Sequence, residues 1–449
     1  MAAPQARTAP YGAGVRILVL FTRDLRVHDH PALWEACGAA SEVVPLFVVD
    51  PALMGRSPNR ARFITECLAE LDRALVLRGG RLFVREGDVA ARAVETAVEA
   101  GCREIFVTSD AGGTAARRVE RLSALAAARG VRLRTFPGHA VVEPGAVAPH
   151  GARAYRVFTP YLHAWCAATR RSPVGTPRAI RVPPDLSAGR LPSPGRSRPT
   201  ALELPPGGEA AGRKRMQRFL SRGAGAYGEG RNDLAGDRTS RLSPYLRFGC
   251  ISTAELAAKA SEIPGAEEFV RQLAWRDFFH QLMAEHPSMS RRDLRETTHE
   301  PAFLNEAVTA AWIAGRTGLP LVDAGMRQLA QEGWMHNRAR LVTASFLTRR
   351  AGVPWQVGAA HFSHHLVDGD PANNAGNWQW VAGTGVSGRR NRPLNPARQA
   401  ERFDRDGAFV RRYVPELAGV EGRAVLAPWR HPELRRATGY PAPILDVTD

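Results

Sequence analysis

Short apolar runs that alternate with helical stretches restrict the fold of this sequence more than any other feature. Four apolar runs occur in the first 140 residues, at 15–20, 43–49, 81–84 and 105–107. The stretches around them that have the apolar spacing of helices are 60–77, 90–100 and 116–128. Short buried strands that alternate with helices indicate a parallel sheet covered on both faces. We therefore predict a Rossmann-like α/β domain over residues 15–140.

The chain changes character after this region. Residues 170–212 are crowded with Pro, Gly and Ser, which predicts an extended connection with little regular structure. After Lys214 helical patterns dominate, at 255–262, 267–285, 321–331, 338–349 and 357–366. The expected order of parts is a disordered tail (1–14), the α/β domain (15–140), a connecting segment (141–213) and an all-α domain (214–449). No G-x-G-x-x-G motif follows the first apolar run, so a standard dinucleotide site is not expected there.

The charge of the chain favours a polyanionic partner. The formal net charge is +17, and Lys214 and Lys259 are the only lysines, so arginine carries nearly all of the positive charge. Nucleic acid or an anionic membrane would suit this excess. A general compositional bias toward arginine explains the choice of residue, but explains the net excess less easily. Five scattered cysteines without a CxxC motif fit a reducing cytoplasm, and no apolar run is long enough to span a membrane.

Polar and aromatic side chains that could form a functional site are concentrated in the segment 367–380, VDGDPANNAGNWQW. Its acids and asparagines need partners when they are buried, so they do not suit a plain core segment. An EF-hand is excluded, because Ala372 and Asn373 stand where a calcium loop needs an acid or Asn and then Gly. The nearby His361, His364 and His365 have no carboxylate or Cys at ligand spacing, so we expect no metal site.

Three further segments combine polar and aromatic groups. The first, TSRLS at 239–243, places hydroxyls and amides before a predicted helix, where they can cradle phosphate oxygens or merely cap the helix. The second is WMHNRAR at 334–340, and the third is QLAWRDFF at 272–279. In single-stranded nucleic acid, arginines can bind the phosphates and the aromatic rings beside them can stack on the bases. Six of the nine tryptophans fall between positions 275 and 380, where packing, stacking or electron transfer could each use them.

These segments together resemble the photolyase/cryptochrome family, and most closely the class I photolyases that repair cyclobutane pyrimidine dimers in DNA. The resemblance runs from Arg16 to about Leu417. The motifs that carry it occur in family order: FTRDLRVHDHPAL at 21–33, TSRLSPYLRFG at 239–249, QLAWRDFF, VDAGMRQLAQEGWMHNRAR at 322–340, DGDPANNAGNWQW and NPARQ at 395–399.

The resemblance implies that the helical domain holds FAD, the cofactor that carries the chemistry. By similarity, FAD would contact Tyr227, Thr239, Ser240, Arg241, Leu242, Ser243, Arg340, Asp368, Gly369, Asp370 and Asn374. Arg340 would pair with Asp368, and the amide of Asn374 would accept a hydrogen bond from flavin N5. Trp378 and Trp355 match the first two tryptophans of the family's electron-transfer chain.

The implied partner is ultraviolet-damaged DNA, with the lesion flipped out of the duplex. Trp275 and Trp380 would form aromatic walls, and Gln272, Arg276, Asn337, Arg338 and Gln399 would contact the lesion or the backbone. We also expect DNA contacts from Arg389, Arg390 and Arg392. The expected enzyme is a cytoplasmic monomer that splits the dimer by electron transfer from reduced flavin.

Two departures from the family pattern leave alternatives open. Gln272 replaces the usual Glu, as in relatives that repair (6-4) photoproducts, although Asn337 and Leu341 replace the histidines of those relatives. Ala302 and Phe303 stand where the third tryptophan of the electron-transfer chain would lie, so photoreduction is expected to be impaired or rerouted. An antenna pigment, a folate or a deazaflavin, is possible in the α/β domain, but the acid expected of a folate site is not evident at 110–118.

Three rival functions follow. The chain could be a (6-4) photolyase or a cryptochrome-type photoreceptor, which shares the flavin pocket without repair. From another class, it could be a structural nucleic-acid-binding protein with a decayed flavin site. The retained Trp275, Trp380 and Asn337 favour repair over reception of light, and Asp368 and Asp370 argue against a decayed site.

Overall fold

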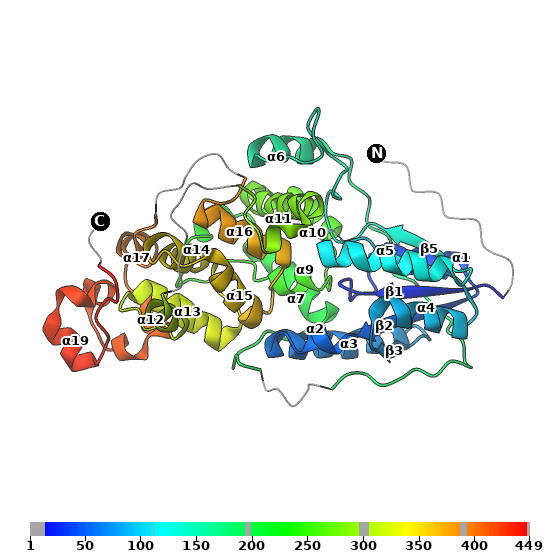
Figure 1. Ribbon diagram of the computed structural model, residues 1–449, viewed down its shortest axis with the longest axis horizontal. Coiled ribbons are helices and arrows are strands. Elements are labelled where there is room, and N and C mark those ends of the chain that lie inside the picture. Colours follow the sequence, from blue (N-terminus) through cyan, green and yellow to red (C-terminus); the bar gives the residue numbers. More distant parts are fainter. Residues whose placement is uncertain (1–13, 111, 194–198, 296–304, 387–392, 447–449) are drawn as a thin grey trace. The chain divides into compact units, whose positions relative to one another are not determined.

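The computed structural model describes residues 14–110, 112–193, 199–295, 305–386 and 393–446 (Figure 1). By internal contacts the chain divides into two compact units. The first unit contains the residues up to 198 together with 205–225 and 240–288, and the second contains 199–204, 226–239 and the residues from 289 onward.

A five-stranded parallel sheet is the centre of the first unit, as the alternation of apolar runs predicts. Its strands lie in the order β3-β2-β1-β4-β5. Their bounds are Arg16–Phe21 (β1), Glu42–Val49 (β2), Phe83–Glu86 (β3), Cys102–Thr108 (β4) and Arg132–Phe136 (β5). The sequence did not indicate β5, because this edge strand (RLRTF) keeps polar side chains and is only half-buried.

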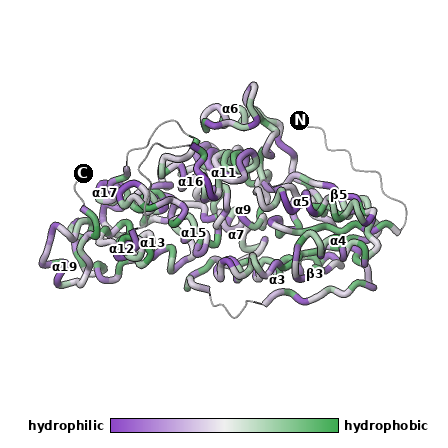
Figure 2. The backbone as a smooth tube through the Cα atoms, viewed as in Figure 1, coloured by the Kyte–Doolittle hydropathy of each residue, from purple (hydrophilic) through white to green (hydrophobic). Residues whose placement is uncertain are grey.

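Helices cover the sheet because β1 is apolar on both of its faces. Leu18 and Leu20 pack with α4 (Val89–Glu99) and α5 (Gly113–Ala127) in one core, and the alternate residues Ile17 and Val19 are equally inaccessible on the opposite side. Figure 2 shows β1 as a hydrophobic stretch for most of its length. The remaining helices around the sheet are α1 (Pro31–Ala39), α2 (Pro51–Met54) and α3 (Pro58–Val76).

In its described residues, the first unit continues into five helices. They are α6 (Phe158–Ala167), α7 (Glu209–Arg222), α9 (Ser243–Arg247), α10 (Thr253–Ser261) and α11 (Glu267–Glu285). Between α6 and α7 the described residues contain no helix or strand, as the Pro- and Gly-rich composition predicts. This connection is nevertheless ordered by hydrogen bonds to the sheet, from Val43 N to Arg181 O (2.8 Å) and from Val84 N to Ala188 O (2.7 Å).

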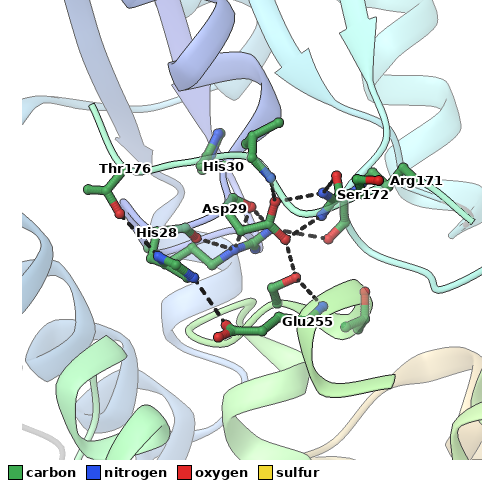
Figure 3. Close-up of polar contacts among 12 residues, drawn as sticks. His28, Asp29, His30, Arg171, Ser172, Thr176 and Glu255 are labelled. Atoms are coloured by element: carbon green, nitrogen blue, oxygen red, sulfur yellow. Dashed lines mark hydrogen bonds and ion pairs between the residues drawn. The ribbon is translucent and has the colours of Figure 1, made fainter. Parts of the chain in front are cut away.

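Asp29, in the loop after β1, ties the connection to α10. Its two carboxylate oxygens accept hydrogen bonds from both terminal nitrogens of Arg171 (2.6 and 2.7 Å), from Val174 N (2.7 Å) and from Ser252 Oγ (Figure 3). We call these four residues the Asp29 cluster. Burial alone would raise the pKa of Asp29, but the pairing with Arg171, the charge of Arg26 and the bond from Ser252 together lower it. The loop, the connection and α10 are therefore held at one point.

The second unit is helical, and its described residues include no strand. Its helices are α8 (Tyr227–Gly230), α12 (Glu306–Ile313), α13 (Pro320–Glu332), α14 (Asn337–Ser345), α15 (Trp355–His365), α16 (Pro371–Ala382), α17 (Pro396–Phe403), α18 (Ala408–Tyr413) and α19 (Pro432–Thr438). The helix predicted over 338–349 is interrupted, since α14 ends at Ser345 and a π-helical turn covers Phe346–Arg350. Among the described residues, no helix is both long and apolar enough to cross a membrane.

Candidate functional site

The second unit contains a pocket between α14, α15 and α16 that encloses about 80 Å³. Its wall combines carboxylates, amides and a guanidinium with apolar and aromatic groups. The lining residues are Asn337, Arg340, Leu341, Ala344, Phe362, Leu366, Asp368, Gly369, Asp370, Asn373, Asn374, Asn377, Trp378 and Val381. The polar segment predicted at 367–380 therefore lines a cavity rather than filling a core.

Asp368 is the most informative residue of this pocket. Its Oδ2 accepts a hydrogen bond from Arg340 Nη2 at 2.8 Å, as the sequence predicts, and Arg340 is held in turn by a bond from its Nε to Met335 O (2.8 Å). The other oxygen, Asp368 Oδ1, is buried and has no hydrogen-bond partner among the described residues. A buried carboxylate oxygen without a donor is costly. The pocket thus fits a ligand that brings an N–H or O–H group to this atom, as a flavin does.

The loop from Asp368 into α16 orients two further polar groups. Asp370 caps α16 by accepting hydrogen bonds from the backbone and side-chain nitrogens of Asn373 (3.0 and 2.9 Å). One turn later, Asn374 Nδ2 donates to Ala359 O at 2.9 Å. This bond fixes the amide plane, so that Asn374 Oδ1 is the atom left to accept from a ligand.

Aromatic rings close the pocket around Trp378, which is buried. Its ring meets Phe362 edge-on at 5.0 Å and Trp312 at 6.2 Å between centroids, with an interplanar angle of 73° to Trp312. A Cβ on Gly358 would lie 2.1 Å from Trp378 Cη2, so only glycine fits here. Gly358 lies one turn after Trp355, whose indole N–H donates to Asp293 Oδ1 (2.7 Å).

The structure thus brings Trp378 against the helix that carries Trp355, and adds Trp312 as a second aromatic neighbour. Sequence reasoning noted Trp312 only as one of the clustered tryptophans and gave it no role. Trp312 is fully buried, and its indole N–H donates to Thr343 O at 3.1 Å. The predicted gap in the chain, at Ala302 and Phe303, lies outside the described residues.

The predicted phosphate cradle has an unusual backbone. Arg241 has φ +49°, a left-handed conformation that residues with side chains rarely adopt and that is often found at functional sites. Around it, Ser240 O accepts from Arg215 Nε (3.1 Å), and Leu242 N donates to Ser240 Oγ (3.3 Å). Leu242 is buried, and Ser243 begins α9. These four residues, 240–243, belong to the first unit, whereas Tyr227 and Thr239 belong to the second.

A basic cluster, formed by Arg338 of α14 with the neighbouring Arg231 and Arg402, lies at the start of α14. Arg338 donates to Asn232 Oδ1 from Nη2 (2.7 Å) and Nε (3.2 Å), and its Nη1 reaches Gln399 Oε1 at 3.4 Å. The guanidinium also lies 4.3 Å from the ring centroid of Phe403. Burial lowers the pKa of Arg338, and the neighbouring Arg231 and Arg402 lower it further. The structure therefore brings Arg338 and Gln399 together within a concentration of positive charge, next to Asn337 of the pocket.

The predicted lesion contacts on α11 differ in their surroundings. Trp275 is half-buried and lies against Phe158, a residue to which sequence reasoning gave no role. Gln272 Nε2 donates to Glu268 O at 3.4 Å. Arg276 was predicted to reach DNA, but it is 12% exposed, and its Nη1 bonds to His139 O (2.7 Å) and Asp277 Oδ1 (3.3 Å). These contacts hold one terminal nitrogen of Arg276, and its contact with DNA stays a prediction.

Other residues singled out by the sequence have more limited surroundings. Trp380 is half-buried on α16, and Arg389, Arg390 and Arg392 lie outside the described residues. The ring of His361 packs on Trp312 and His365, and burial lowers its pKa to about 4. Within the described ranges, no group of three or more metal-ligating side chains could hold a metal ion.

Comparisons with known proteins identify the family of this chain. Residues 17–180 match the family model described as DNA photolyase, and residues 269–449 match the model described as the FAD binding domain of DNA photolyase. The chain is 47% identical to a deoxyribodipyrimidine photo-lyase of Streptomyces griseus, with 96% of each chain covered.

Solved structures give the same result. A class III photolyase from Agrobacterium tumefaciens superposes with a TM-score of 0.90 at 29% identity, covering 98% of this chain and 96% of the other. An archaeal photolyase from Sulfolobus tokodaii, solved with two FAD molecules, superposes with a TM-score of 0.85 at 30% identity, covering 96% of each chain.

Proposed function

This chain belongs to the DNA photolyase family, and from that premise we infer that it is a deoxyribodipyrimidine photo-lyase, a light-dependent DNA repair enzyme that binds FAD. The observation that carries the inference is the pocket of the second unit, in which Asp368 pairs with Arg340 and keeps one buried oxygen for a donor from the ligand. When it is bound and reduced, FAD would supply the light-driven electron that splits the pyrimidine dimer, and it would take this electron back after the split.

The contribution of the polar residues is to hold the flavin ring and to set its hydrogen bonds. Arg340 orients Asp368 through its bond to Oδ2, so that Oδ1 meets a donor of the ligand. Asn374 presents an oxygen acceptor, because its nitrogen is already engaged with Ala359 O. An acceptor at this place favours a protonated flavin N5, whereas an aspartate would add a negative charge to the pocket.

Further contacts with the cofactor are proposed for the cradle. The left-handed backbone at Arg241 turns the chain between Ser240 and α9, where amides and hydroxyls suit the phosphates and hydroxyls of FAD. We assign the same kind of contact to Tyr227, Thr239, Leu242 and Ser243. Gly369 and Asp370 line the pocket beside Asp368.

The tryptophans would return oxidised flavin to its reduced form under light. Trp378 would pass an electron to the flavin and take one in turn from Trp355 or from Trp312, whose ring centroid lies 6.2 Å from that of Trp378. Trp378→Phe should abolish rapid photoreduction in the presence of a thiol reductant, followed by flavin absorbance. Unchanged photoreduction in this variant would exclude the assignment. Comparing Trp355→Phe with Trp312→Phe then shows which branch supplies the electrons.

The basic cluster and the pocket rim would bind the damaged DNA. Arg338 and Gln399 suit the phosphate backbone, and Asn337 lies in the pocket wall, where a flipped base could meet it. Trp275 and Trp380 offer aromatic faces for stacking, worth about 1–3 kcal/mol per base. Gln272 can hydrogen-bond a thymine as a neutral group.

The substrate is tested by measuring repair under light. The reduced enzyme should remove cyclobutane dimers from irradiated DNA and leave (6-4) photoproducts, because Asn337 and Leu341 stand where proton-donating histidines would be needed. Repair of only the (6-4) product would overturn the proposed substrate. Flavin binding without repair of either lesion would instead identify a cryptochrome-type receptor.

Finer features of the enzyme remain proposals of ours. Five free cysteines suit a reducing cytoplasm, where we place the enzyme as a monomer. An antenna pigment, a folate or a deazaflavin, would belong to the α/β domain. The archaeal neighbour, whose two FAD molecules implicate a novel light-harvesting cofactor, supports the idea of a second pigment in such proteins.

A further inference from the structure

Phe158 is stacked face to face on Trp275. The ring centroids are 3.6 Å apart, and the planes differ by only 7°. Aromatic side chains more often meet offset or edge-on, so this close parallel contact is distinctive. Since a ring has two faces, a base can stack on Trp275 only from the side opposite Phe158.

Several contacts hold Phe158 in place. It is the first residue of α6 and is 7% exposed, and its ring meets Phe278 edge-on at 5.7 Å. The guanidinium of Arg271, one turn before Trp275 on α11, lies 5.5 Å from the Phe158 centroid. We therefore treat the Phe158 ring as a fixed neighbour of Trp275 that DNA binding would not displace.

We propose that Phe158 is a positioning residue for lesion recognition, which fixes the plane of Trp275 so that its opposite face receives the flipped base. This inference rests on the proposed function, in which Trp275 stacks on the lesion. Two other neighbours lie with their centroids 5.6 Å from that of Trp275: Phe278 meets it edge-on at 89°, and Phe279 is tilted by 31°, so neither is stacked parallel to it. Among these three rings, Phe158 is the one that lies parallel to the indole.

The test is a double-mutant cycle on DNA binding in the dark, using the flavin-loaded enzyme and duplexes with and without one cyclobutane dimer. Phe158→Leu should weaken binding of damaged DNA about tenfold and leave undamaged DNA unchanged, because it loosens a stacking surface and not a phosphate contact. Phe158→Tyr, which keeps the stack, should restore wild-type discrimination. In a Trp275→Ala background, Phe158→Leu should have no further effect.

The controls separate the inference from general damage to the fold. Phe219→Leu is matched, since Phe219 has the same 7% exposure and an aromatic partner, Phe269, in the same unit. It should leave discrimination unchanged. Equal losses from Phe158→Leu with and without Trp275, equal losses on both DNAs, or tighter binding would each overturn the proposal. If Trp275→Ala itself leaves damaged-DNA binding intact, the proposed lesion contact fails as well.

Discussion

Two buried aspartates, Asp29 in the first unit and Asp368 in the second, differ in one respect that separates a structural site from a binding site. Both pair with an arginine, and both are less than a tenth exposed. Asp29 receives four hydrogen bonds from its own chain, two on each oxygen (Figure 3). Asp368 receives one on Oδ2, and its Oδ1 has no partner among the described residues.

The difference indicates what each carboxylate is for. A buried charge whose hydrogen bonds are all made within the chain stabilises the fold and has little capacity left for a ligand. A buried charge with one open oxygen lowers stability until a ligand completes it. The hydrogen bonds of Asp29, all made within the chain, therefore indicate a structural role for the Asp29 cluster. The oxygen of Asp368 that has no partner indicates a binding site in the pocket.

Removing Asp29, the carboxylate whose hydrogen bonds are all made within the chain, should have the largest effect on stability. Asp29→Ala removes the carboxylate that pairs with Arg171 and that is the negative charge acting most strongly on the buried Arg26. The expected loss is about 3–5 kcal/mol in the free energy of unfolding. Chemical denaturation followed by circular dichroism measures this loss. The flavin content of the folded fraction should stay unchanged.

The matched control is Asp185→Asn, which breaks a pair between Arg16 and an aspartate that is 65% exposed. It should leave the free energy of unfolding nearly unchanged, because water screens an exposed pair. If the two variants were equally stable, the Asp29 cluster would not hold the first unit together.

Removing the open carboxylate should affect the ligand more than the fold. Asp368→Ala should raise the dissociation constant of FAD at least about tenfold, while the free energy of unfolding without added flavin changes by about 1 kcal/mol or less. Flavin fluorescence titration measures the first quantity. Asp404→Ala is the control, because Asp404 is equally inaccessible in the same unit and caps α18 without lining the pocket. It should lower stability and leave flavin affinity intact.

The same contrast explains how far the sequence could predict this molecule. Strands β1, β2 and β4 were predictable because their buried residues are continuous apolar runs, and the pocket was predictable because 367–380 is too polar for a core. The Asp29 cluster was not predictable, since Asp29 bonds to residues 142 and 223 positions away. The stacking of Phe158 on Trp275 likewise depends on tertiary packing, because nothing in the sequence near Phe158 differs from that of an ordinary buried helix start.

Acid should weaken the closed site in a defined direction. The pKa of Asp29 lies below its ordinary value of 3.8, because Arg171, Arg26 and Ser252 together outweigh burial, which would raise it. The folded protein therefore binds fewer protons here than the unfolded chain, so the stabilisation is complete above pH 3.8 and declines below it. The stability difference between wild type and Asp29→Ala should be constant from about pH 7 to pH 5 and narrow below about pH 4. A difference that narrows already near pH 6 would contradict the lowered pKa.

Replacing each arginine by lysine should give the smallest effects and the finest test of the comparison. Arg171 holds Asp29 with both terminal nitrogens, at 2.6 and 2.7 Å, a fork that lysine cannot reproduce, so Arg171→Lys should cost about 1–2 kcal/mol in unfolding free energy. Arg340 makes a single bond to Asp368 and is 25% exposed, so Arg340→Lys should cost less, about 0.5 kcal/mol. An equal cost at both positions would mean that the number of bonds made within the chain does not separate the two sites.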